Sequence, residues 1–431
     1  MTAIVGIINR NGVAVAADSA ATHTISADNK KKITNHANKI FELSKYRPVG
    51  VAICGTLSFM GMPWEDAFKM YRQQLGKKSF PHLTDYLKDL MNYVRTTILP
   101  KFEEDQKGQL AYLANSFKNE LLNAVREELK EQGKEEDTIT MEEVLPLMKK
   151  KLEEFSVAYS KREMRIGNDY EGYSLATFIS YATEIISSII KDVLDDGHCP
   201  DGFEKIFTES LYNVLVSTNH VYLSTTEIIV YGYGDEDMFP SCQSIKVSAS
   251  FDGRIKWGVS SSYSVTNVST AWIIPYAQAD VSNTVVRGVD QTLRDKFIDE
   301  AKVVLEKLKC DLLNKMKDVG APEDFQNALL SFDIKPYTDL YENELDQYIK
   351  NNYIKKLMDT VSFLMKEDLA DMAESLVKMT CLKRHFTTDD ETVGGPVDVA
   401  VITRGDGFVW IKRKHYFSPD INHHYFERQE L

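Results

Sequence analysis

The sequence lacks the features that mark membrane-spanning and secreted proteins. No apolar stretch reaches the roughly 18 residues that a membrane-spanning helix needs. No basic segment followed by an apolar core and a cleavage site opens the chain, so we expect no signal peptide. The five cysteines are scattered and contain no Cys-x-x-Cys pair, as is typical of reduced thiols. We therefore expect a cytoplasmic protein with no membrane partner.

The sequence also lacks an excess of basic residues: its formal net charge is −13. This balance argues against nucleic acid as the main partner. No Gly-x-Ser-x-Gly, His-Glu-x-x-His or phosphate-loop motif occurs. The pair His423–His424 has no cysteine or carboxylate at the spacing of metal ligands. We expect neither a metal nor an organic cofactor.

The order of strand-like and helix-like segments predicts the fold class. Strand patterns occur at 2–17, 39–55 and 226–258, with a polar loop expected at 22–38. Helical periodicity covers 57–221, with a break expected at Gly133 and a restart at Thr140. It also covers 284–384, where one helix is expected to run from Leu357 to Leu376. A hairpin closes the pattern at 394–417. Strands and helices that occupy separate stretches of the sequence indicate an α+β protein.

The first residues carry the strongest candidate for catalysis. Thr2 stands directly before the first strand, behind Met1 alone. A free amino-terminal threonine carries its own base, because an α-amino group has a pKa near about 7.7–8.0. A nearby lysine would favour the neutral amine, and a carboxylate would hold that lysine in place. Asp18 and Lys39 supply these groups if the strands pair as the turn signals suggest.

The segment "TAIVGIINRNGVAVAADSAAT" resembles the opening of proteasome β-type subunits and their bacterial relatives. The resemblance implies Thr2 as nucleophile, with Asp18 and Lys39 as its partners, and the Gly55 N–H as oxyanion donor. The segment "TTDDETVGGPVDVAVIT" resembles the acidic and Gly-Gly segment of that family, which implies a role for Asp390. Val393 stands where the family often has serine, and Ser282 is the nearest candidate for a second accessory serine.

The same resemblance implies a four-layer αββα sandwich, the N-terminal nucleophile hydrolase fold, with large helical insertions. Residues 1–62, 222–290 and 386–431 would form the core. Residues 63–221 and 291–385 would form helical layers or insertions. The family's pocket positions fall on Ala21, Ile53 and Leu57, which implies a preference for apolar side chains.

The resemblance further implies cleavage of peptide or protein substrates by a homo-oligomer, with or without an unfoldase partner. Two alternatives remain open at this point. One is a catalytically inactive scaffold or binding subunit of the same fold. The other is an amidohydrolase that acts on a small molecule.

Overall fold

The computed structural model describes residues 2–25, 30–134, 141–161, 168–194, 200–387 and 393–424. The chain divides into two compact units. The first unit joins residues 1–40 to residues 264–431, and the second contains residues 41–263. Each unit contributes a five-stranded sheet together with helices, so the predicted α+β class is confirmed.

The first unit is built on a sheet with the strand order β12-β1-β2-β13-β14. Neighbouring strands in it are antiparallel throughout. Every residue of the two central strands next to the amino terminus is buried, which explains their nearly continuous apolar sequence. The strands are β1 (Ala3–Asn9), β2 (Gly12–Ala17), β12 (Ala271–Ala277), β13 (Asp398–Thr403) and β14 (Gly407–Lys412).

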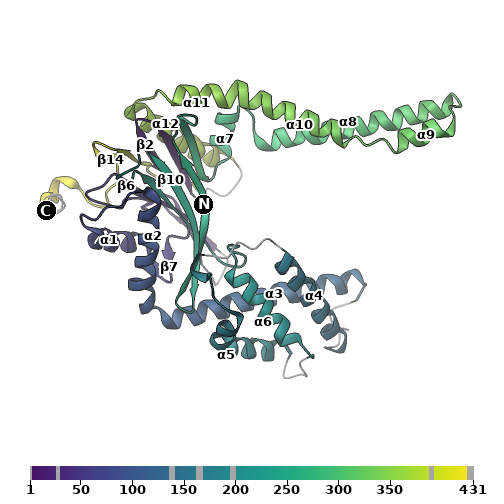
Figure 1. The fold of residues 1–431 in the computed structure, drawn as a ribbon, viewed down its shortest axis with the longest axis horizontal. Coiled ribbons are helices and arrows are strands. Elements are labelled where there is room, and N and C mark those ends of the chain that lie inside the picture. Colours follow the sequence, from purple (N-terminus) through teal and green to yellow (C-terminus); the bar gives the residue numbers. More distant parts are fainter. Residues whose placement is uncertain are drawn as a thin grey trace. The chain divides into compact units, whose positions relative to one another are not determined.

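Helix α12 (Lys366–Phe386) packs against β1, β2 and β13 (Figure 1). Its Leu369, Ala373 and Val377 share a buried cluster with Val5 and Ala14 of the sheet. This layer holds the strands that position the amino terminus. The other helices of the unit lie between β12 and α12 in the sequence: α7 (Asp280–Arg287), α8 (Gln291–Asp318), α9 (Glu323–Leu330), α10 (Lys335–Ile349) and α11 (Lys355–Val361).

The single helix expected from Leu357 to Leu376 is wrong. The structure has two helices, α11 and α12, and Met365 between them is extended, with φ −79° and ψ 169°. The cause is tertiary: the buried Asn9 side chain donates to the carbonyl oxygens of Val361 and Leu364, both at 2.8 Å. These carbonyls bond to the β1–β2 turn region and do not continue a helix.

The second unit contains a sheet with the order β11-β10-β9-β6-β5. The cluster that packs on it includes Trp64 and Phe68 of α1 and Leu87 and Leu90 of α2. The elements are β5 (Ile40–Glu42), β6 (Val49–Gly55), β9 (Thr226–Gly232), β10 (Ser241–Phe251), β11 (Arg254–Ser264), α1 (Trp64–Leu75) and α2 (Leu83–Tyr93). The strands of residues 2–17 and those of residues 39–55 therefore belong to two different sheets.

A separate helical cluster completes the second unit. It is formed by α3 (Glu103–Glu131), α4 (Met141–Lys161), α5 (Leu175–Leu194) and α6 (Phe203–Val216) around residues such as Phe117 and Phe207. The predicted break at Gly133 is confirmed, because α3 ends at Glu131 and Gly133 has φ +74°. The expected restart residue Thr140 lies outside the described residues. No helix in the described ranges is long and apolar enough to cross a bilayer.

The polar loop expected at 22–38 is partly wrong. Strands β3 (Ala21–Ile25) and β4 (Lys30–Thr34) pair antiparallel within it, from Ala21 opposite Thr34 to Ile25 opposite Lys30. The β-branched residues Thr22, Ile25 and Ile33 favour strands, although the lysines around them resemble a loop. A second short hairpin joins β7 (Ser58–Phe59) to β8 (Met62–Pro63).

The junction of α11 and α12 yields a stability prediction. We expect Asn9→Ala to lower the free energy of unfolding by about 2–3 kcal/mol, because it removes the two hydrogen bonds to Val361 and Leu364 and also takes the acceptor Asn9 Oδ1 away from the Asn11 N–H. Asn11→Ala is the matched control, since the exposed Asn11 side chain donates to the same Leu364 oxygen at 2.9 Å. We expect it to cost less than about 1 kcal/mol. Urea titration measures both, and equal losses would contradict the assignment.

Candidate active site

Thr2 lies at the buried start of β1. The residue is 5% exposed, and its carbonyl oxygen accepts from the Gln278 N–H at 3.1 Å. The next amide, Ala3 N–H, donates to Asp18 Oδ1 at 2.8 Å. Both groups of the peptide bond that joins Thr2 to Ala3 are thus hydrogen-bonded, which distinguishes this terminus from the loose termini of most domains.

Asp18 is the centre of the polar contacts around this terminus. It follows β2, is 1% exposed, and accepts four hydrogen bonds. Oδ1 binds the Ala3 N–H and the Lys39 ammonium, the latter at 2.7 Å. Oδ2 binds the amides of Ala20 and Gly394, both at 3.1 Å. Both oxygens of this buried carboxylate are thus satisfied by two hydrogen bonds each.

Lys39 brings a positive charge to the same place. It lies directly before β5 and is 1% exposed, and its ion-pair partner is the buried Asp18 carboxylate. Replacing a buried ion pair by well-packed apolar residues is often neutral or even stabilising. The pair lies beside the amide that follows Thr2, because Asp18 Oδ1 accepts from both groups.

The Gly-Gly segment closes the site from a distant part of the chain. Besides the Gly394 amide on Asp18, the Gly394 carbonyl accepts from Ser19 N–H at 3.1 Å. Gly395 has φ +78°, and a Cβ there would lie 2.9 Å from Asn35 Cβ, so glycine suits this position. Ser19 Oγ donates to the Pro396 carbonyl at 2.6 Å. Ser19 was not among the predicted site residues, although it directly follows Asp18 in the sequence.

The accessory positions differ in their surroundings. Val393 is 1% exposed and packs in the apolar cluster below the first sheet, where a hydroxyl would have to be buried. Ser282 is fully buried on α7, and its Oγ has no hydrogen-bond partner among the described residues. Asp390 lies outside the described residues, so its role stays a prediction.

Three of the residues expected from the resemblance, Ile53, Gly55 and Leu57, belong to the second unit and are described there. Gly55 has φ +85°, and a Cβ would lie 2.2 Å from the Thr225 carbonyl oxygen, so a tight bend requires glycine. Leu57 is partly buried against the core of that unit. Neither observation tests the proposed roles in oxyanion stabilisation or substrate binding.

The expected pocket position Ile53 is buried in this structure. Ile53 is 1% exposed and belongs to the core between the second sheet and helices α1 and α2. Ala21, at the start of β3, is 8% exposed. The expected preference for apolar side chains at Ala21, Ile53 and Leu57 stays a prediction.

Cys381 of α12 is a second candidate nucleophile, because the charges of both Asp18 and Lys39 act on its thiol. Burial and the negative charge of Asp18 raise the pKa of its thiol to about 11, although Lys39 acts in the opposite direction. At neutral pH the thiol is therefore protonated, and a protonated thiol is a weak nucleophile. The hydroxyl of Thr2 remains the better candidate.

Comparisons with known proteins add little to this geometry. No family model matches the chain, and no curated protein sequence matches it either. Among solved structures, a mutant of Anbu from Hyphomicrobium sp. strain MC1 aligns over 100% of this chain and 95% of its own. The sequence identity is 9% and the TM-score is 0.25. At these values the likeness carries no argument about function.

The buried pair yields a prediction for the folded state. We expect Asp18→Asn to lower the free energy of unfolding by about 3–5 kcal/mol, because it leaves the Lys39 ammonium buried without a counter-charge. The double variant Asp18→Asn, Lys39→Met should lose less than the sum of the two single variants. Urea titration of the wild type, Asp18→Asn, Lys39→Met and the double variant measures this coupling energy.

The exposed pair Glu65–Lys69 provides the control. Its atoms lie 2.6 Å apart, with the side chains 30% and 50% exposed. We expect Lys69→Met to change stability by less than about 1 kcal/mol. Strict additivity at Asp18 and Lys39 would contradict a coupled buried pair.

Proposed function

We propose that the protein is an amino-terminal threonine hydrolase that cleaves amide bonds in peptides. The observation that carries this proposal is the shared oxygen of Asp18, which binds both the Lys39 ammonium and the amide directly after Thr2. A nucleophile, a cation and a buried carboxylate are thus gathered at one terminus. Removal of Met1 would free the α-amino group that the chemistry needs.

In the proposed reaction, Thr2 Oγ attacks the substrate carbonyl carbon. The α-amino group takes the hydroxyl proton through a water molecule, and the nearby Lys39 charge keeps that amine neutral beforehand. The C–N bond breaks, the leaving amine takes the proton, and an ester with Thr2 remains. Water then attacks the ester by the same route and releases the acid.

Two further parts of the proposal come from the resemblance to proteasome β-type subunits. The Gly55 N–H would stabilise the negative oxygen of the tetrahedral intermediate, and Asp390 would support the terminus. The two sheets would form the inner layers of an αββα sandwich. Each unit supplies a sheet with helices packed on it, as such a sandwich needs.

A non-catalytic binding subunit of the same fold is the second candidate. The observation in its favour is Val393, whose buried apolar side chain stands where the family often has serine. The buried Asp18–Lys39 pair argues the other way, because a scaffold has no need for a charged pair beside its terminus.

A peptide epoxyketone tests the proposal, since its ring adduct requires both the threonine hydroxyl and a free α-amino group. We expect intact mass and peptide mapping to place the adduct on Thr2 and to show that Met1 is absent. Thr2→Ala should form no adduct and should lose at least about 1,000-fold in peptide cleavage, as expected when a nucleophile is removed. Cys381→Ala should keep the adduct.

Each failure has a separate meaning. Equal peptide cleavage by the wild type and by Thr2→Ala would exclude Thr2 as nucleophile. A protein without Met1 that forms no adduct would favour the binding subunit or an amidase for small molecules. An adduct lost in Cys381→Ala would assign the reaction to the thiol.

A further inference from the structure

An open hollow of about 240 Å³ lies in the second unit, where β6 ends and the β7–β8 hairpin begins. Its nine lining residues come from this hairpin, from α3, from the segment before β9 and from β10, and all belong to that unit. None of the nine is charged. Six are polar: Thr56, Ser58, Gln109, Tyr112, Ser224 and Ser248.

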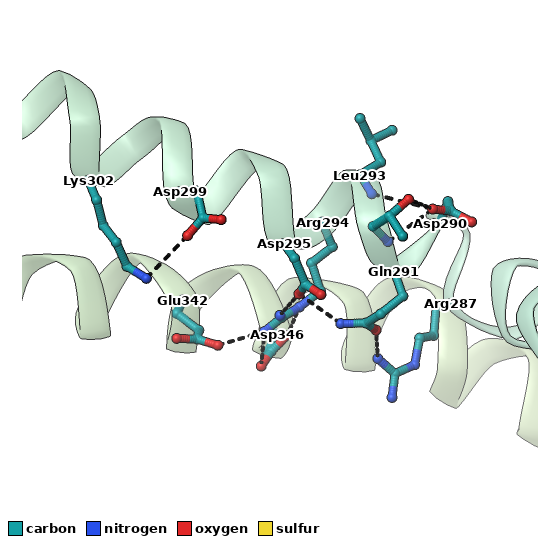
Figure 2. Close-up of polar contacts among 11 residues, drawn as sticks. Arg287, Asp290, Gln291, Leu293, Arg294, Asp295, Asp299, Lys302, Glu342 and Asp346 are labelled. Atoms are coloured by element: carbon teal, nitrogen blue, oxygen red, sulfur yellow. Dashed lines mark hydrogen bonds and ion pairs between the residues drawn. The ribbon is translucent and has the colours of Figure 1, made fainter. Parts of the chain in front are cut away.

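The polar side chains of the hollow have hydrogen-bonding capacity that the chain does not use. Buried polar groups usually find a partner within the protein. Arg294 of α8 shows the usual case, since it donates to Asp346 at 2.7 and 2.8 Å and to Glu342 at 3.1 Å (Figure 2). The hollow differs, because five of its polar side chains form no hydrogen bond with any residue that the structure describes. They are Thr56, Ser58, Gln109, Tyr112 and Ser224. Donors and acceptors that converge in this way favour a ligand with hydrogen-bonding groups.

The backbone beside the hollow is fixed before any ligand binds. The Thr56 N–H donates to the Thr225 carbonyl oxygen at 2.9 Å, and the Thr56 carbonyl accepts from Thr226 Oγ1 at 2.5 Å. The indole of Trp64 donates to the same Oγ1 at 3.0 Å. Both backbone groups of Thr56 are therefore used, and its side chain is what it presents to a ligand. A site fixed in advance loses less entropy on binding.

The hairpin that carries Ser58 has a strained turn. Met60 and Gly61 join β7 to β8 with φ +50° and +80°. Such a two-residue turn favours Asn-Gly, because a bulky side chain rarely adopts a positive φ. Met60 is 9% exposed and belongs to the core cluster of the second unit, so its burial holds the turn in this conformation. Strained residues of this kind gather at ligand-binding sites, and this one fixes the position of Ser58.

A carboxamide is the ligand group that suits this lining. It has two N–H donors and one accepting oxygen, so it pairs with the carboxamide of Gln109 through two hydrogen bonds. An apolar group would cover the hydroxyls without bonding them. A carboxylate or an ammonium would lose water without meeting a counter-charge in the lining. His220, which is hydrogen-bonded to Ser248 at 2.8 Å, adds no charge at neutral pH, because burial lowers its pKa to about 4.

We propose that this hollow receives the carboxamide side chain of a glutamine or asparagine in a peptide substrate. A water molecule takes about 30 Å³, so the hollow has room for roughly eight waters and accepts a side chain of this size. The inference rests on the proposed function, in which the Gly55 N–H meets the substrate carbonyl. Thr56 follows Gly55 directly, and an extended chain advances only about 3.3 Å per residue. A residue next to the scissile bond therefore reaches the hollow.

Peptide binding to the Thr2→Ala protein tests this pocket without cleavage. The probes are fluorescein-labelled penta-alanine peptides that carry one Gln, Met or Glu at each position in turn, and fluorescence anisotropy measures their binding. Methionine is close to glutamine in size but has no carboxamide, and glutamate adds a charge. At one position we expect the Gln peptide to bind at least about tenfold more tightly than the other two.

Variants of the lining provide the matched control. Gln109→Met keeps the size of the side chain and removes its carboxamide, so the dissociation constant of the favoured Gln peptide should rise at least about tenfold. Ser58→Ala should raise it about threefold, and it carries the test if circular dichroism shows that Gln109→Met does not fold. Gln132→Met, at the exposed end of the same helix, should leave the dissociation constant unchanged.

The outcomes separate the pocket from the proposed hydrolysis. Equal binding of the three peptides at every position would overturn the pocket, and so would no binding, tightest binding of the Glu peptide, or equal effects of Gln109→Met and Gln132→Met. A Gln preference in a protein whose wild type forms no epoxyketone adduct would keep the pocket and exclude the hydrolysis. An adduct on Thr2 without a Gln preference would do the reverse.

Discussion

The carboxylate of Asp18 is the constraint on which the first unit depends. It binds donors from four parts of the chain: the start of β1, the residues after β2, the residue before β5 and the Gly-Gly segment before β13. The loss of any of these donors would leave part of a buried carboxylate without a hydrogen bond, which costs free energy. The position of Thr2 therefore follows from the complete set of four contacts.

The local part of this site was predictable from the sequence, and the distant part was not. The β1–β2 hairpin places Ile4 opposite Ala17, so residues 2–3 and 18 must meet at its open end once the turn is recognised. Lys39 followed from its position in the resemblance. The Gly394 amide, 376 residues from Asp18, could be placed only by the pairing of β13 with β2. The local periodicity of the sequence does not show which distant strands pair with each other.

The errors have equally physical causes. The helical pattern from Leu357 to Leu376 is genuine, but Asn9 binds two of the carbonyl oxygens at the break. Ile53 was expected at a pocket from the resemblance, and its side chain is buried in the core of the second unit. A shift of one residue along a strand exchanges its two faces, so the assignment of single pocket residues is sensitive to register.

The segment Gln291–Ile349 is joined to the layer that covers the first sheet. Asp280 of α7, the helix before this segment, binds Lys383 at 2.8 Å and Arg384 at 3.0 Å, both on α12. Helix α11 follows the segment and contacts β12, the strand whose following residue Gln278 binds Thr2. Helices α7 and α11, which flank the segment Gln291–Ile349, therefore both contact elements that surround the amino terminus.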